Sequence, residues 1–433
     1  MAMNVNQEGY NRRLAAVQQI LHKYGLESTK VTPIAYVEHC PFHFNNFIYK
    51  VDLASPATPA TFSQTPQPCT VPPPAAGVSS LVVRMSNPKA EGLNNASRVE
   101  NDVAAQHVAR ASVRAAGLPP LVPAVYAWTP CRYPDIPDET GFGWTLGEFK
   151  EGADLDGQFS GLSLEDAKSV VEQLAAVFTA VQKAELPSTV TKFGALTLDA
   201  AGNIVSGQTP LLKGGPWDTY ADFWVARLQA QLSESNGSSL LKGWADGGVR
   251  ERIDTFMAGG GVQKILGSVD VNQKVLVHGD LTMNNVLYDS KTKRITALLD
   301  FDWSTVSHPC DEFLTGLWDI GGGIHERNEK FLSMVLKGDF SVQPEGLSDE
   351  DIRKWEVAKA WDAAITKTKA TRPSDIAGVE RIEALRDLED LLCPFVLASD
   401  VMLRRISDED KAKKKQETAD KILSWLNTYE TLS

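Results

Sequence analysis

The sequence has few cysteines, no long apolar run and no excess of basic residues. Its five cysteines are scattered over 433 residues, and no Cys-x-x-Cys pair occurs. This argues against a disulfide framework and against a zinc site built from such pairs. No apolar segment approaches the length of a membrane span. The polar N-terminus also lacks the apolar centre of a secretory signal.

Acidic residues outnumber basic ones, which gives a net charge of −12. Proteins that bind nucleic acids carry basic patches, so the charge argues against such a partner and favours neutral or cationic small molecules. Hydrophobic residues make up 43% and charged residues 23% of the chain, as in ordinary globular proteins. We therefore expect a cytoplasmic protein with neither a nucleic-acid nor a membrane partner.

Two short segments in the C-terminal half carry the clearest chemical signal. They read HGDLTMNN at residues 278–285 and LLDFD at residues 298–302. Together they supply a carboxylate, an amide and a second carboxylate in the order that magnesium-assisted phosphoryl transfer uses. The alternative interpretation is an ordinary polar turn before a hairpin, because a motif needs structural context.

The predicted strands around these segments explain how they could meet. Residues 286–288 and 295–299 are rich in β-branched and apolar residues and flank a polar turn, which predicts a hairpin. In an antiparallel hairpin the start of one strand faces the end of the next, so Asn285 and Asp300 should become neighbours. Asp280 lies on the loop that enters the hairpin. These three oxygen-bearing residues are hard ligands of the kind that Mg²⁺ prefers.

The predicted elements divide the chain into two lobes of an α+β fold. Residues 1–147 form a small antiparallel sheet with one main helix and a flexible Pro/Ala/Thr-rich insertion at 54–79. Residues 148–152 form a hinge, and residues 153–433 are mainly helical. The expected helices lie at 7–24, 97–116, 164–183, 219–232, 249–257 and in several segments between 349 and 429. The expected strands lie at 34–37, 47–53, 80–85, 122–128 and 143–149, followed by a hairpin near 196–205 and the hairpin described above.

The chain resembles the aminoglycoside phosphotransferase family, which has a protein-kinase-like fold and is related to choline and fructosamine kinases. The resemblance covers roughly residues 34–425. Its motif, HGDLxxxN, differs from that of protein kinases, which usually have arginine where Gly279 stands. The resemblance implies a bilobal kinase that uses ATP and Mg²⁺ to phosphorylate a hydroxyl of a small molecule. It does not identify the acceptor, because one fold hosts many substrates.

The resemblance also assigns roles to individual residues. His278 resembles the structural histidine that braces the metal-binding loop, and Asp280 resembles the catalytic base. Asn285 and Asp300 resemble the metal ligands.

Further roles fall in the N-terminal lobe and the hinge. Arg84 resembles the strand residue that contacts the nucleotide phosphates, and Glu100 resembles its ion-pair partner on the following helix. The alternative for Arg84 is a solvated strand residue. Glu148 and Lys150 are candidates for main-chain contacts with adenine at the hinge.

The chain departs from the protein-kinase pattern at three further places. The G-x-G-x-x-G loop is missing, which leaves Asn45, Asn46 or backbone amides as the candidate phosphate clamp. Asp302 stands where protein kinases have glycine, either as a second carboxylate near the metals or, the reading we favour, as a helix cap. No Ala-Pro-Glu segment occurs, which argues against a protein kinase.

The acceptor pocket is expected in the helical lobe, with acidic and tryptophan side chains as candidates. Each also has a structural interpretation, since helices carry carboxylates and bury tryptophans. The candidates are Trp303, Asp311, Glu312, Trp318 and Asp319. A competing hypothesis for the whole chain is a catalytically inactive protein that keeps the kinase fold to bind a ligand or partner.

Overall fold

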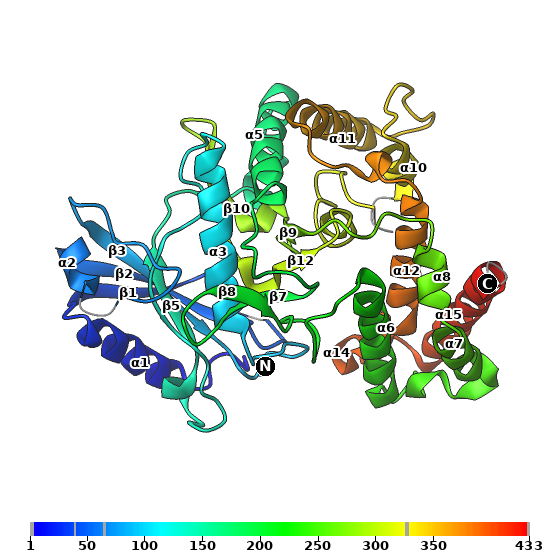
Figure 1. Cartoon of the computed structure of the whole chain (residues 1–433), viewed down its shortest axis with the longest axis horizontal. Helices are drawn as coiled ribbons and strands as arrows, with labels where there is room; N and C mark the ends of the chain where they lie inside the picture. The colour runs from blue at the N-terminus through cyan, green and yellow to red at the C-terminus, as the bar shows by residue number, and fades with distance from the viewer. Residues whose placement is uncertain (1–3, 39, 64–65, 325–328, 431–433) are drawn as a thin grey trace.

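The computed structural model describes residues 4–38, 40–63, 66–324 and 329–430, and it confirms the predicted bilobal α+β architecture (Figure 1). The N-terminal lobe contains a five-stranded antiparallel sheet in the order β1-β2-β3-β5-β4. Its elements are α1 (Tyr10–Lys23), β1 (Ser28–Ile34), β2 (Asn46–Ala57), α2 (Pro59–Phe62), β3 (Val78–Ser86), α3 (Arg98–Ala115), β4 (Val125–Thr129), η1 (Glu139–Gly141) and β5 (Trp144–Glu148).

Alternating apolar residues explain how this sheet packs. Phe47, Tyr49 and Val51 alternate along β2 and are all buried, in one cluster with Val17 and Leu21 of α1. Because side chains of a strand alternate between its two faces, this pattern directs one face of β2 towards α1.

Helix α3 bridges the two lobes. It contacts β4 in the first lobe and β7, α5 and η5 in the second. In Figure 1 it stands between the sheet and the rest of the molecule. Its first half is buried almost throughout, including the polar Arg98, Asn101 and Asp102. Charged residues at the start of α3 are therefore placed between the lobes, where a site could form.

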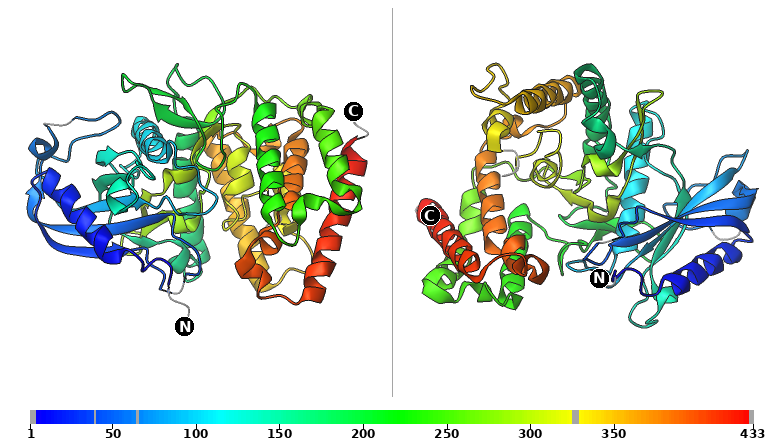
Figure 2. Two further views of the ribbon diagram at one scale, coloured as in Figure 1. Left: turned by 90° about the horizontal axis from the view of Figure 1, so that it is seen from below. Right: turned by 180° about the vertical axis from the view of Figure 1, so that it is seen from behind.

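The C-terminal lobe is mainly helical. Its long helices α6, α12 and α15 lie at the end of the molecule far from the sheet (Figure 2). Helix α5 begins at Leu164, directly after Ser163 as predicted, and the hydroxyl of Ser163 accepts the N–H of Asp166 at 3.0 Å and caps the helix. Among the described residues, no helix combines the length and apolar character needed to cross a membrane. The elements are β6 (Ala153–Asp154), α4 (Asp156–Phe159), α5 (Leu164–Gln182), β7 (Ala195–Leu198), β8 (Ile204–Gly207), α6 (Tyr220–Gly237), η2 (Lys242–Trp244), η3 (Asp246–Gly248), α7 (Val249–Ala258), α8 (Gly261–Leu266), β9 (Val275–Val277), η4 (Met283–Asn285), β10 (Val286–Asp289), β11 (Arg294–Leu298), η5 (Phe301–Trp303), β12 (Thr305–Ser307), α9 (Asp311–Thr315), α10 (Glu329–Lys337), α11 (Asp349–Thr368), η7 (Pro373–Asp375), α12 (Val379–Leu392), α13 (Phe395–Ala398), α14 (Asp400–Leu403) and α15 (Asp408–Tyr429).

The sequence misplaced one strand and missed three. The first strand ends at Ile34 instead of beginning there. It is an edge strand of the sheet without a fully buried residue, so its sequence lacks the alternation that marks a strand. Strands β6, β9 and β12 are only two or three residues long, too short for such a pattern.

The insertion at residues 54–79 lies between β2 and β3. Strand β2 extends to Ala57, which pairs with Val78, and the short helix α2 follows. Further along, the N–H of Val71 donates to the carbonyl of Val125 on β4 at 2.9 Å. Parts of the insertion are therefore held against the sheet, and its flexibility stays a prediction.

Candidate active site

The loops at the open end of the hairpin lie side by side. Strand β10 pairs with β11 so that Val286 faces Leu298. Beyond this pair, the N–H of Leu299 donates to the carbonyl of Asn285 at 2.8 Å. The loop that ends at Asn285 is therefore bonded to the segment that leads into Asp300, as the sequence predicts.

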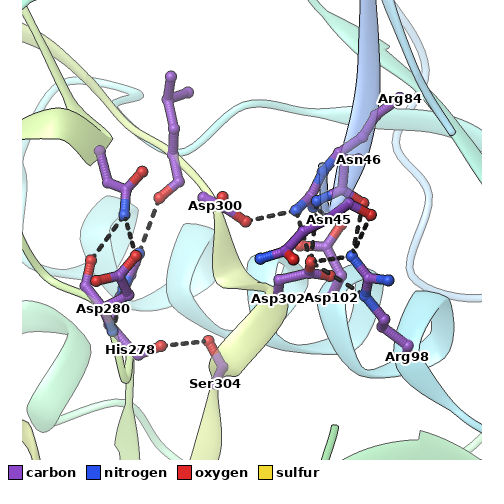
Figure 3. Close-up of polar contacts among 12 residues, drawn as sticks. Asn45, Asn46, Arg84, Arg98, Asp102, His278, Asp280, Asp300, Asp302 and Ser304 are labelled. Carbon is purple, nitrogen blue, oxygen red and sulfur yellow. Dashed lines mark hydrogen bonds and ion pairs between the residues drawn. The ribbon is translucent and has the colours of Figure 1, made fainter. Parts of the chain in front are cut away.

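Asp280 and Asn285 are hydrogen-bonded to each other. The amide Nδ2 of Asn285 donates to the backbone oxygen of Asp280 at 2.8 Å and to its carboxylate at 2.9 Å. Burial raises the pKa of Asp280 to about 6, and the negative charge of Asp300 adds to this effect. In Figure 3, Asp300 lies between Asp280 and a cluster of charged residues on the other side of the site. All three predicted oxygen donors are thus gathered in one region.

His278 connects the loop that carries Asp280 to the segment that leads into Asp300. Its side chain is fully buried, with Nε2 placed 2.9 Å from the carbonyl of Leu299. Its Nδ1 accepts the N–H of Asp280 at 3.3 Å. Because Nδ1 acts as an acceptor, Nε2 must carry the proton and donate to Leu299. Burial lowers the pKa of His278 to about 4, which keeps the ring neutral. These contacts are those of a residue that braces the loop.

The buried His278 should make the protein sensitive to acid. Its pKa is about 4 when folded and 6.5 in the reference state, so between these pH values the unfolded chain binds a proton that the folded chain does not. The neutral His278 therefore contributes about 3 kcal/mol to the free energy of unfolding. This contribution is complete above pH 6.5 and is lost as the pH falls towards 4.

The loss of stability on acidification can be measured by comparing the wild type with a variant that lacks the histidine. Chemical denaturation of the wild type and of His278→Gln should be compared at several pH values between 6.5 and 4. The wild type should lose stability relative to the variant on acidification, because only the wild type carries the buried ring. Parallel pH profiles would contradict a buried neutral histidine.

Two predicted acceptor residues have structural contacts instead. The carboxylate of Glu312 is buried and accepts the N–H groups of His278 at 2.6 Å and Gly279 at 3.2 Å. Burial raises its pKa to about 7. Asp311 is also buried and accepts the hydroxyls of Tyr220 and Ser307. Their assignment as acceptor residues is therefore corrected. Glu312 holds the loop of Asp280 through the backbone N–H groups of His278 and Gly279. No sequence pattern predicts such a contact between a side chain and a distant backbone.

Gly279 is required by the backbone at its position. Its φ angle is +86°, and a Cβ built on it would lie 2.4 Å from the carbonyl oxygen of Trp303. A positive φ disfavours other residues, and the carbonyl leaves no room for a side chain. The departure from the protein-kinase motif, which usually has arginine here, thus has a local steric cause. Trp303 contributes its backbone to this contact, and its role towards an acceptor stays a prediction.

The predicted ion pair between Arg84 and Glu100 is wrong. Nη1 of Arg84 lies 2.7 Å from the carboxylate of Asp102 instead, and Nη2 contacts Asp300. Residues two apart on a helix lie about 200° apart around its axis, so Glu100 and Asp102 cannot both face Arg84. The sequence located the correct helix but not its rotation, because α3 is buried on several sides and shows no clear polar face.

Asp302 is not a helix cap, because it lies inside η5, whose N-cap residue is Asp300, and a place near the metals stays a prediction. Asp302 is 3% exposed, and one oxygen accepts Nδ2 of Asn46 at 2.9 Å and Nη2 of Arg98 at 2.6 Å. Burial alone would raise the pKa of Asp302, but the charges of Arg84 and Arg98 outweigh it and lower the pKa to about 2.

The two candidate clamp residues contact the same arginine. Arg98 also donates to the backbone carbonyl of Asn45 at 2.6 Å and to the side-chain oxygen of Asn46 at 3.0 Å. Both groups already have a protein partner. A phosphate-binding role for these asparagines therefore stays a prediction, and for Asn46 it would require its side chain to exchange partners.

At the hinge, Glu148 and Lys150 contact each other. Nζ of Lys150 lies 2.8 Å from the carboxylate of Glu148. The N–H of Glu148 donates to the carbonyl of Ala124 at 2.8 Å, so this donor is already used within the protein. Adenine binding by other main-chain groups of the hinge stays a prediction.

The candidate metal ligands fit magnesium by their chemistry. Nδ2 of Asn285 is committed to Asp280, which leaves its Oδ1 as an acceptor. The Asp300 side chain is 39% exposed and can reach a ligand. Carboxylate and amide oxygens suit Mg²⁺, which uses few protein ligands and keeps several waters. Among the described residues, no group of three His, Cys, Asp or Glu side chains is placed to hold a metal, so a site here would rely on the asparagine.

A cavity of about 720 Å³ opens beside the loop of Asp280. It is bounded by α4, α10 and α11, and its walls include Met283, Trp318 and Asp319 but not Trp303. The carboxylate of Asp319 accepts the N–H of Met283 at 2.5 Å, and burial raises its pKa to about 6. Two of the five predicted acceptor residues, Trp318 and Asp319, therefore line this cavity.

Comparison with known proteins assigns the chain to a family. A model of the "Phosphotransferase enzyme family" (APH) matches residues 75–337, more than half of the chain. The chain belongs to the phosphotransferase enzyme family. The resemblance that the HGDLxxxN motif indicated is thereby confirmed, and the protein is a phosphotransferase at this level of description. No curated protein matches the sequence.

Several solved structures are similar to this phosphotransferase. A thermostable mutant of aminoglycoside phosphotransferase APH(4)-Ia, in complex with ADP and hygromycin B, is 15% identical with a TM-score of 0.46, over 94% of this chain and 97% of that one. A Ralstonia eutropha protein provisionally assigned as an aminoglycoside phosphotransferase is 16% identical with a TM-score of 0.48, over 96% and 98%. The gentamicin complex of APH(2″)-IIa is 12% identical with a TM-score of 0.45, over 95% of both chains.

Proposed function

We propose that this phosphotransferase transfers the γ-phosphoryl group of ATP, in a magnesium-dependent reaction, to a hydroxyl of a small molecule. The observation that carries the proposal is the arrangement around the hairpin. Asp280 is bonded to Asn285, and the backbone of Asn285 is bonded to the segment that leads into Asp300. A proton acceptor and two oxygen ligands next to each other are what this chemistry needs.

Asp280 is the proposed base. It accepts a hydrogen bond from the acceptor hydroxyl and orients that oxygen towards the phosphorus. Its pKa of about 6 leaves it ionised at neutral pH and closer to the working pH than an exposed carboxylate, as general bases require. The contact with Asn285 fixes the direction of the carboxylate, and the contact of His278 with the neighbouring N–H fixes the loop.

Asn285 and Asp300 are the proposed metal ligands. When bound there, Mg²⁺ would neutralise charge on the phosphate oxygens. Arg84 is the proposed phosphate contact, because its guanidinium lies beside Asp300 and is fixed by an ion pair with Asp102. A cation held there would stabilise the negative charge that gathers on the phosphate oxygens during transfer.

The cavity lined by Trp318 and Asp319 is the proposed acceptor pocket. The cations on its walls are Lys330, Lys354 and Arg353. Lys330 and Lys354 are paired with Asp351 and Glu350 at 2.6 and 2.7 Å, and Arg353 donates to the carbonyls of Phe159 and Leu162 at 3.3 and 2.8 Å. The carboxylate of Asp319 has backbone hydrogen bonds but no cationic partner among the described ion pairs. A neutral or cationic compound that carries hydroxyls would suit such walls better than an anion.

A turnover assay tests the proposed function. The protein is incubated with Mg²⁺ and ATP and with a panel of hydroxyl-bearing compounds, with water and a serine-containing peptide as control acceptors, and ADP release is followed by a coupled assay. We expect ADP release that depends on one class of small molecules. Nucleotide binding without acceptor-dependent release for any compound would instead favour the inactive binding protein.

A further inference from the structure

Arg98, the first residue of α3, is buried to 1% exposure between the two lobes. Its guanidinium donates to four separate segments of the chain. In the segment after Asp300 it contacts one oxygen of Asp302 twice, from Nε at 3.1 Å and from Nη2 at 2.6 Å. In the N-terminal lobe it contacts the carbonyl of Asn45 at 2.6 Å, the side chain of Asn46 at 3.0 Å, the carbonyl of Asn87 at 3.3 Å and the side chain of Asn95 at 3.4 Å.

These contacts tie the proposed metal ligand to the N-terminal lobe. Asp302 lies two residues after Asp300, on the short helix η5. Its contacts with Arg98 and Asn46 fix this helix against the start of α3 and the start of β2 (Figure 3). Asp300 itself has a φ angle of +65°, an uncommon conformation for a residue other than glycine. Such a conformation persists only where surrounding contacts impose it.

The charges of the cluster show why Arg98 is needed. Arg84 and Arg98 face the carboxylates of Asp102, Asp300 and Asp302. Asp102 and Asp302 are both buried. Without Arg98, Arg84 alone would face three carboxylates, and Asp302 would lose its closest cation. Nη2 of Arg84, which already lies 3.2 Å from Asp302, would then move closer to Asp302 and away from Asp300.

We propose that Arg98 is a positioning residue for magnesium, which holds the carboxylate of Asp300 in place through Asp302. The proposal rests on the proposed function of this site. It assigns no contact between Arg98 and the substrate or metal, so its effect should appear in how strongly Mg²⁺ promotes nucleotide binding. A purely structural arginine would change stability and leave this coupling unaltered.

Arg98→Lys tests the proposal, because lysine keeps the charge but cannot reach all the partners of the planar guanidinium. The matched control is Arg227→Lys. Arg227 is another buried arginine, and it donates to Glu389 at 2.9 and 2.6 Å, in the part of the lobe formed by α6 and α12. Asn46→Ala is a second variant, which removes one contact to Asp302 without changing a buried charge.

The measurement is the affinity for ATP by calorimetry, with Mg²⁺ and with EDTA, together with the melting temperature of each protein. We expect Arg98→Lys to reduce the gain in affinity from Mg²⁺ by roughly 10- to 100-fold, the range found when residues that orient metal ligands are changed. Asn46→Ala should reduce it in the same direction. Arg227→Lys should lower the melting temperature and keep the wild-type gain.

Two results would overturn the proposal, and they differ. A wild-type protein whose affinity for ATP does not depend on Mg²⁺ would remove the proposed metal site and the role of Arg98 with it. A wild type that depends on Mg²⁺, with an unchanged gain in Arg98→Lys and Asn46→Ala, would leave the proposed function intact and make Arg98 a structural residue only.

Discussion

Asp280→Asn is expected to lower the rate of phosphoryl transfer by roughly 10²- to 10⁴-fold, the usual contribution of a positioned general base. This corresponds to about 3–5 kcal/mol of the barrier. The substitution keeps the shape of the side chain, and the backbone oxygen of Asp280 still accepts Nδ2 of Asn285 at 2.8 Å. Asp280 pairs with no arginine in the described ion pairs. Nucleotide affinity should therefore remain nearly unchanged while turnover is lost.

Single-turnover kinetics on an accepted substrate and calorimetry with ATP would measure the two effects separately. Asp289→Asn is a suitable control, because Asp289 lies at the far end of β10 and accepts the N–H of Lys291 at 3.0 Å in a turn. It should retain wild-type turnover. An Asp280→Asn protein that turns over at the wild-type rate would show that another group accepts the proton or that none is needed.

The parts of the site that the sequence predicted are local in the chain. Asn285 and Asp300 are joined by one hairpin, so the strand pattern and the turn between them were enough to bring them together. Asp280 belongs to the same loop. The helix that pairs with Arg84 was also correctly located, but its partner is Asp102 and not Glu100, since burial of α3 on several sides hides its rotation.

The contacts that the sequence could not predict join distant segments. Arg98 and Asp302 are separated by 204 residues, and nothing in either segment marks the other as its partner. Glu312 has the same difficulty, because its carboxylate accepts backbone N–H groups of His278 and Gly279. Any residues could supply those N–H groups. Buried charges of this kind become interpretable only once the packing of the two lobes is known.

Asp300→Ala is expected to abolish the dependence of ATP binding on Mg²⁺. The lost gain in affinity should be at least on the order of 100-fold, because Asp300 is the proposed ligand itself and changes to residues behind a ligand already cost up to that factor. The same substitution leaves Nη2 of Arg84 paired with Asp302 alone, at 3.2 Å, and removes a negative charge that would repel the phosphates. In EDTA, the affinity of the variant for ATP should therefore equal or slightly exceed that of the wild type.

A loss of ATP affinity that appears with Mg²⁺ but not with EDTA distinguishes a metal ligand from a residue that only supports the fold. A damaged fold would weaken ATP binding both with Mg²⁺ and with EDTA, and it would also weaken adenosine binding, which needs no metal. Removal of a metal ligand should leave adenosine binding unchanged and should weaken ATP binding only when Mg²⁺ is present. If Asp300→Ala kept the full gain from Mg²⁺, the metal would have to be held elsewhere, and the ion pair with Arg84 would be the only remaining role for this carboxylate.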